Sequence, residues 1–183
     1  MSKSYLLLIV TFVLFWSCTQ TQNNTSHLTI IDNSKDIGNI QIIRPIDGMI
    51  IWENNSDSIQ ANQEGNYNYK LNIQSPEIIK LIINNERLNM VIQPNQSYEL
   101  LVTDSNLKFM GSNAEGNNLL NEFNRPANGT IKEAQLFVND STATLLKQKI
   151  DSFKTSDLKK LDQLLTQNDI DATFYDMVAN EIN

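Results

Sequence analysis

The chain has 183 residues, of which 14 are basic and 21 acidic, giving a net charge of −7. This length fits one ordinary domain or slightly more. The basic residues are scattered, whereas phosphate-backbone binding needs clustered Lys and Arg, so nucleic acid is not an expected partner. The chain contains one cysteine, Cys18, and one histidine, His27, which excludes an intrachain disulfide, a Cys-x-x-Cys pair and a zinc cluster built on these residues. His27 lies in a polar stretch and is expected to be solvated, so it does not supply the base of a Ser-His-Asp triad.

The amino-terminal segment carries the clearest signal. Lys3 precedes an apolar run from Tyr5 to Trp16, which ends at Ser17-Cys18. The run is shorter than the roughly 20 apolar residues that span a bilayer, and it is typical of the hydrophobic region of a signal peptide. The Ser17-Cys18 pair resembles the lipobox of signal-peptidase-II substrates, although residues 15 and 16 are bulkier than the strict consensus.

This resemblance implies that residues 1–17 are a lipoprotein signal peptide, that Cys18 is the lipidation site and that the bilayer is a partner through acylated Cys18. Thr19 is not the aspartate that commonly marks inner-membrane retention. The expected location is therefore the bacterial cell envelope, at the outer membrane and facing the periplasm. The alternative is an uncleaved amino-terminal anchor with an incidental cysteine. Because residues 19–26 are a polar Thr/Gln/Asn stretch without hydrophobic periodicity, residues 18–36 are predicted to be the lipid anchor and a flexible tether.

Residues 37–111 are predicted to form an antiparallel β-sandwich domain. Short runs rich in Ile, Val, Leu and Tyr alternate with Asn, Asp, Gly and Pro, a pattern typical of strands and turns. Asn84-Asn85 can adopt left-handed conformations, and Gln93-Pro94-Asn95 fixes a bend. The predicted strands span residues 40–43, 48–53, 58–61, 66–73, 78–83, 89–92, 97–103 and 107–110.

Residues 112–183 are predicted to be a helical segment, so the fold class is mainly β followed by α. A helix begins after Ser112 or Asn113 and ends at Arg125-Pro126. A second helical set spans 145–153, a third follows a Ser156-Asp157 cap, and Asp171 caps the last. The apolar stripes favour packing of these helices on each other or on a neighbouring domain, with a coiled coil or a membrane-surface helix as alternatives.

No motif predicts a catalytic residue, a cofactor or a metal. Acidic residues at Asp47, Glu53 and Asp57, and at Asp169 and Asp171, are only a weak signal for general acid/base or calcium roles. Asp169-Ile170-Asp171 lacks the ligand count and the glycine of a calcium loop, so helix capping or solvation is favoured there. Gly111 is read as a turn glycine rather than part of a phosphate cradle, and the serines and threonines lack an evident base. The aromatic residues are expected to pack in the core or to form a platform for a sugar or peptide: Trp52, Tyr67, Tyr69 and Tyr98.

Two stretches resemble a known family. Residues 90–100 (MVIQPNQSYEL) and 107–120 (LKFMGSNAEGNNLL) are similar to the hairpin and the strand-to-helix junction in the N-terminal β-domains of envelope thioredoxin-like proteins of the AhpC/TSA and TlpA type. Asn95 stands where that family usually has glycine. In those proteins a β-sandwich and a helical segment precede a thioredoxin domain with Cys-x-x-Cys. This chain has no Cys-x-x-Cys, so no residue present inherits the oxidoreductase activity.

The resemblance implies a non-catalytic, lipid-anchored envelope module, equivalent to the accessory N-terminal part of a thiol-disulfide oxidoreductase and truncated within the helical segment. A thioredoxin-like domain or partner protein is then the possible protein partner. The alternative is a stand-alone outer-membrane lipoprotein that binds a glycan or a peptide. A domain fragment is expected to expose an apolar face at Phe174, Val178 and Ile182, whereas a complete binding protein is expected to be stabilised by its ligand.

Overall fold

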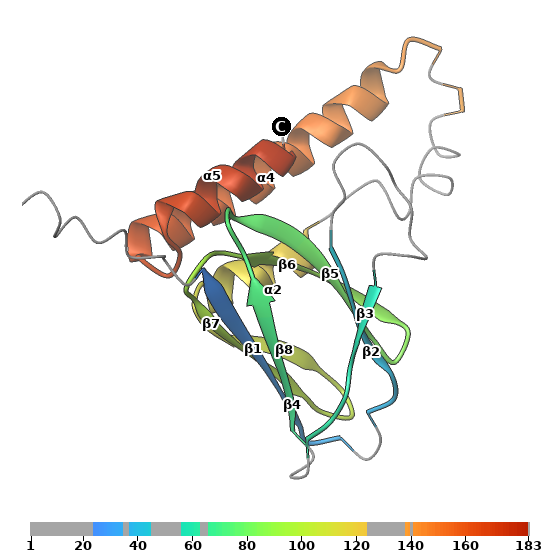
Figure 1. The fold of residues 1–183 in the computed structure, drawn as a ribbon. Helices are drawn as coiled ribbons and strands as arrows, with labels where there is room; N and C mark the ends of the chain where they lie inside the picture. The colour runs from blue at the N-terminus through green and yellow to red at the C-terminus, as the bar shows by residue number, and fades with distance from the viewer. Residues whose placement is uncertain are drawn as a thin grey trace, which may run out of the picture.

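The computed structural model describes residues 24–34, 37–44, 56–62, 66–123, 138–139 and 141–182. These residues form eight strands in two four-stranded sheets, followed by three helices (Figure 1). The prediction of a mainly β fold followed by α, with a sandwich and a helical extension, is confirmed.

The first sheet has the strand order β4-β1-β7-β8, and the second has the order β3-β2-β5-β6. All strand pairs are antiparallel except β1 and β7, which run parallel with Leu28 opposite Tyr98. The strands of the first sheet are β1 (Thr25–Asp32), β4 (Tyr67–Asn72), β7 (Ser97–Val102) and β8 (Leu107–Gly111). Those of the second are β2 (Ile40–Ile43), β3 (Ser56–Ile59), β5 (Glu77–Ile83) and β6 (Glu86–Ile92).

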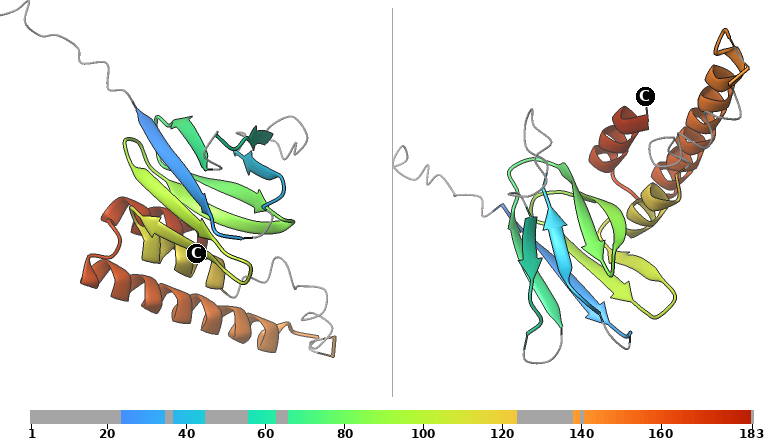
Figure 2. Two further views of the ribbon diagram at one scale, coloured as in Figure 1. Left: turned by 90° about the horizontal axis from the view of Figure 1, so that it is seen from below. Right: turned by 90° about the vertical axis from the view of Figure 1, so that its right-hand side faces the viewer.

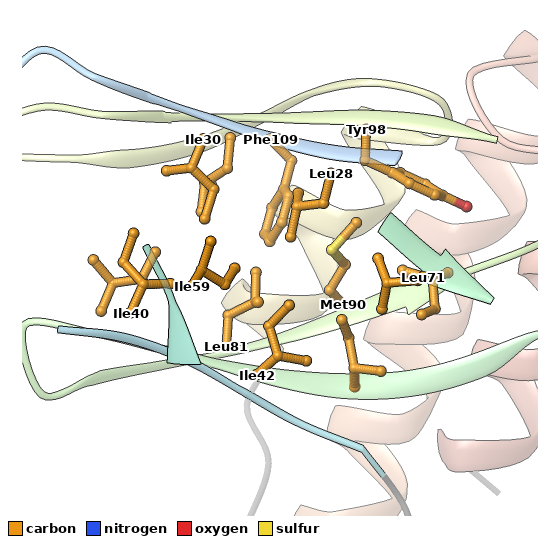
Figure 3. Packing of buried hydrophobic residues seen from close by; sticks show 14 of the residues in the cluster. Leu28, Ile30, Ile40, Ile42, Ile59, Leu71, Leu81, Met90, Tyr98 and Phe109 are labelled. Atoms are coloured by element: carbon orange, nitrogen blue, oxygen red, sulfur yellow. The ribbon is translucent and has the colours of Figure 1, made fainter. Parts of the chain in front are cut away.

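The core lies between the two sheets. Side chains alternate between buried and exposed along a strand because successive residues point to opposite faces. In β1, Leu28 and Ile30 point inward while His27 is exposed, as expected for that histidine. Figure 3 shows the two inner faces meeting, with Ile30, Leu28 and Phe109 opposite Ile59, Leu81 and Met90.

Seven of the predicted strands overlap β2 to β8, and the predicted strand at 48–53 lies outside the described residues. The predicted tether at 18–36 is wrong in its second half, because residues 25–32 form β1. Because the sequence up to Ser26 is polar, it does not indicate a strand. The residues of β1 that point inward are Ser26, Leu28 and Ile30. The sandwich therefore begins about a dozen residues before the predicted boundary at residue 37.

The helices are α2 (Ala114–Glu122), α4 (Thr144–Gln167) and α5 (Ala172–Ile182). The predicted cap at Ser156-Asp157 is wrong, because both residues lie inside α4. Positions 153, 157, 161 and 164 keep a helical spacing toward one face, and Asp157 is buried on that face. The predicted helix end at Arg125-Pro126 lies outside the described residues; α2 itself ends at Glu122.

The helices gather along one side of the sandwich, with α2 nearest the sheets (Figure 2). A second apolar cluster joins Val91 of β6 to the three helices through Leu120, Leu161, Phe174 and Val178. Phe174 and Val178 are each 0% exposed, so the exposed apolar face that was expected of a domain fragment is not present at these two positions. Packing of the helices on each other and on the sandwich is confirmed. No helix among the described residues is both long enough and apolar enough to cross a membrane.

Candidate functional site

The most distinctive polar structure is on the side of the sandwich where β6 ends one sheet and β8 ends the other. An edge strand presents backbone N–H and C=O groups that no further strand pairs. Helix α2 lies against both strands at this side. Its asparagine side chains pair with three residues of these two edges, Asn89 and Val91 of β6 and Phe109 of β8.

Asn117 and Asn121 bind the edge of β6. The Val91 N–H donates to Asn117 Oδ1 over 2.8 Å, and Asn117 Nδ2 donates to the Val91 carbonyl over 3.3 Å. The Asn89 N–H donates to Asn121 Oδ1 over 2.8 Å, and Asn121 Nδ2 returns a hydrogen bond to the Asn89 carbonyl over 2.9 Å. Each carboxamide thus pairs with one residue as a peptide group of an adjacent strand would.

Asn118 does the same for β8. It accepts from the Phe109 N–H over 2.8 Å and donates to the Phe109 carbonyl over 3.1 Å. We call Asn117, Asn118 and Asn121 the asparagine clasp. Its spacing follows from element geometry, since four helical residues rise about 6.0 Å and two strand residues advance about 6.8 Å. Positions 117 and 121 can therefore meet alternate residues of one strand.

A pocket of about 410 Å³ lies beside the clasp, between β6, β8 and α2. Leu88 and Leu107 contribute half-buried aliphatic side chains, and Phe109, which is 3% exposed, also lines the pocket. Asn118 and Asn121 of the clasp also line it. An apolar floor with a few polar groups of fixed orientation is the general character of small-ligand sites.

The charged residues lining this pocket are unequal in sign. Among the described residues that line the pocket, Lys108 of β8 is the one cation, and Glu115 and Glu122 of α2 are the two acids; all three side chains are exposed. The pocket therefore has a net negative rim on a chain that is itself acidic. Such a rim attracts cationic groups more readily than anionic ones.

A second polar cluster joins the β6–β7 turn to α5. Asn113 Nδ2 donates to Asp171 Oδ2 over 2.9 Å, and Gln93 Nε2 donates to Asp171 Oδ1 over 3.0 Å. Asp171 also accepts from the Phe174 N–H over 2.8 Å, which confirms it as the cap of the last helix. Burial raises the pKa of Asp171, but these hydrogen bonds together outweigh it and hold the pKa below its usual value.

Asn113 precedes α2, as predicted, but its side chain does not cap that helix. Its backbone is left-handed, with φ of 50°, and its amide reaches α5 instead. The β6–β7 turn, which contains Gln93, is also bound to the sandwich. Ser26 Oγ donates to the Gln93 carbonyl over 2.6 Å, and the Gln93 N–H donates to Tyr98 Oη over 2.8 Å. These contacts fix α5 against the β-domain, so the cluster has a structural role.

The predicted aromatic platform is not assembled by the described residues. Tyr98 is 1% exposed and packs in the core, and burial raises the pKa of its phenol to about 12. Tyr67 and Tyr69 are half-buried on β4, and the Tyr69 hydroxyl donates to Asp57. Burial, then the hydrogen bond to Asp57, raises the pKa of Tyr69 to about 12. Core packing is therefore the correct interpretation for Tyr98.

The other predicted positions divide as follows. Gly111 is a turn glycine with φ of +83°, and a β-carbon there would lie 2.9 Å from the Ser97 carbonyl. Among the described residues no group of three or more His, Cys, Asp and Glu side chains could hold a metal ion. Four of the predicted residues lie outside the described ranges: Cys18, Asp47, Trp52 and Glu53.

No protein-family model matches the chain, and a search of curated proteins gives no match. Sequence reasoning missed the clasp and the pocket. The available signal was the Asn-Asn pair of the junction motif with a third asparagine one helical turn later.

Proposed function

We propose that the chain is a non-catalytic, lipid-anchored module of the bacterial cell envelope, which holds or positions a partner rather than transforming a substrate. The observation that carries this proposal is the apolar run Tyr5–Trp16 followed by Ser17 and the single cysteine, Cys18. An anchor with two or three acyl chains exceeds the marginal affinity of one chain. Acylation at Cys18 would therefore hold the protein at the membrane stably.

The position of β1 restricts how far the folded body can lie from such an anchor. Strand β1 begins at Thr25, seven positions after Cys18. Seven residues span at most about 25 Å even when fully extended. The sandwich would consequently stay close to the membrane surface, which suits a module that positions something there.

The family proposal is an accessory N-terminal region of a TlpA-type thiol-disulfide oxidoreductase, with a thioredoxin-like domain or protein as partner. In its support, the quoted stretch 107–120 coincides with β8, the turn at Gly111 and the start of α2. The asparagines of that stretch connect the sandwich to the helices. A rigid connection of this kind suits a spacer.

The deciding experiment compares Cys18→Ser with the parent chain in the producing bacterium. The parent should incorporate labelled palmitate and fractionate with membranes, and the variant should do neither. Ser17→Ala is the matched control, because it keeps a small residue before the cysteine and should be processed normally. A Cys18→Ser protein that stays in carbonate-washed membranes would instead identify an uncleaved anchor and refute lipidation.

The second candidate is a stand-alone lipoprotein that binds a glycan or a peptide. The pocket beside the asparagine clasp favours it. The intact mass of the native protein from membranes separates the two candidates. A mass close to that of the lipidated chain supports the stand-alone module, and a much larger product with Cys-x-x-Cys supports the spacer of a redox protein.

A further inference from the structure

We propose that the pocket between β6, β8 and α2 binds a short basic peptide in extended conformation, paired with the edge of β8 at Leu107. The proposal rests on the peptide-binding candidate and is independent of the membrane anchor. Loss of lipidation in the experiment above therefore leaves it standing, and failure of peptide binding leaves lipidation standing.

The hydrogen-bonding pattern of β8 places a backbone edge at the pocket. The N–H and C=O of Phe109 point away from β7, toward Asn118. Outward-facing residues of an antiparallel edge strand alternate, so the N–H and C=O of Leu107 point to the same side. Leu107 lies one repeat beyond the clasp and lines the pocket. An extended peptide can continue at Leu107 the pairing that Asn118 makes at Phe109.

The opposite wall shows the same arrangement. On β6, Asn89 and Val91 face the clasp, and by alternation Arg87 is the next outward residue. The neighbouring Leu88 lines the pocket. Asn118 and Asn121 of the clasp contact the two edge strands and also line the pocket, together with Leu88 and Leu107. Its volume of about 410 Å³ lies within the range of known small-ligand sites.

The floor of the pocket favours a peptide over a sugar. Sugars commonly stack on exposed aromatic rings, but Phe109 is the one aromatic residue among the described residues of the lining, and it is 3% exposed. Leu88 and Leu107 offer aliphatic surface instead, which suits one apolar side chain of a peptide. The apolar contact supplies burial, and the strand edge supplies hydrogen bonds.

The rim favours basic residues on either side of that apolar side chain. Glu115 and Glu122 lie on α2, which forms one wall of the pocket, and Lys108 lies on β8, which forms another. A peptide with a central valine and terminal lysines would therefore bring cationic groups to a pocket whose lining carries two glutamates. Exposed ion pairs of this kind contribute little each but act together.

The test uses the full chain in detergent micelles, labelled with ¹⁵N, and the probe acetyl-Lys-Thr-Val-Thr-Lys-amide. Addition of the probe should move the amide resonances of Arg87, Leu107 and Phe109 with a Kd of about 10 µM to 1 mM. The amide of Asn68, on the opposite edge of the first sheet, should not move. Shifts centred on β3 and β4, or no shift at about 5 mM probe, would overturn the proposal.

Two altered probes distinguish backbone hydrogen bonding by the peptide from nonspecific binding. N-methylation of the central valine removes one hydrogen bond and should weaken binding about tenfold. Maltotriose should leave the same amides unmoved. Equal binding of the N-methylated peptide, or shifts at Leu107 with the sugar, would each refute an extended, paired peptide.

Variants test the charge of the rim. Glu115→Lys/Glu122→Lys should weaken binding of the basic probe about five- to tenfold. The matched control is Glu99→Lys/Asp176→Lys, which makes the same total charge change at exposed positions on β7 and α5. If both pairs weaken binding equally, the rim glutamates do not recognise the peptide and the proposed site is wrong. Far-ultraviolet circular dichroism confirms that each variant is folded.

Discussion

Replacing Asn117 tests whether the asparagine clasp stabilises the fold. Its side chain is 0% exposed and holds both backbone groups of Val91, which is also 0% exposed. Asn117→Ala leaves the Val91 N–H and C=O without their partner in a place that water does not reach. The variant should therefore lose far more stability than the removal of a surface amide.

The magnitude follows from the two hydrogen bonds. A buried polar group left unsatisfied costs about 1–3 kcal/mol, and the 3.3 Å bond belongs at the weak end of that range. Loss of both hydrogen bonds lowers the free energy of unfolding by about 2–4 kcal/mol. The better helix propensity of alanine restores at most about 0.7 kcal/mol of this. The net loss is about 1.5–3 kcal/mol, or a fall in Tm of about 3–12 °C for a protein of this size.

Urea unfolding followed by circular dichroism measures the effect, with the parent chain and two variants as references. Asn121→Ala should cost less, because Asn121 is half-buried and its strand partner Asn89 can be reached by water. Asn72→Ala, an exposed amide on β4, should change stability by less than about 0.5 kcal/mol. An Asn117→Ala variant as stable as Asn72→Ala would refute the role assigned to the clasp.

Three further predictions concern the connection between the sandwich and the helices. Gly116→Ala should cost about 1–2 kcal/mol in urea unfolding, because a β-carbon there would lie 2.5 Å from the Phe174 ring; adding Phe174→Leu should recover part of the loss, and strict additivity would contradict this contact. The lowered pKa of Asp171 means that its contribution to stability is present above about pH 3.8 and is lost as the pH falls through the folded-state pKa. The stability difference between the parent and Asp171→Asn should therefore shrink below about pH 4, and a difference that stays constant down to about pH 2.5 would be inconsistent with that sign. Tyr98→Phe removes the acceptor of the Gln93 N–H, so stability should fall by about 1–2 kcal/mol and the Gln93 amide should exchange faster with solvent; unchanged exchange would show that Tyr98 does not protect that amide.

Local chemistry explains the parts of the fold that the sequence predicts well. Asn84, Asn85 and Asn95 have positive φ, as their places in predicted turns require. Strand β2 occupies the predicted residues, and strands β3 to β8 overlap their predictions. Period-two alternation and turn residues act within a few positions of one another, so one chain segment suffices to recognise them.

Contacts between distant parts of the chain explain the features that the sequence does not predict. Strand β1 pairs with β4 and β7, which lie about 40 and 70 residues further along the chain, so its identity depends on partners that its own composition does not indicate. The clasp requires knowing that β6 and β8 are the edges of different sheets. Without that topology, three asparagines on a helix predict only a polar face. The same applies to the pocket, whose walls come from three separate elements.

The position of β1 also determines how the body would respond to a pull from the membrane. Residues 25–30 pair with β4 and residues 27–32 pair with β7, so β1 lies between two strands of its sheet. Hydrogen bonds of an antiparallel pair stand perpendicular to the strands, and tension along β1 would load that ladder in shear rather than opening it one bond at a time. With Cys18 acylated as proposed, force from the bilayer would enter the fold through an interior strand. The end of the molecule next to the anchor would then resist tension best, and the edge strands of the two sheets would separate before β1 does.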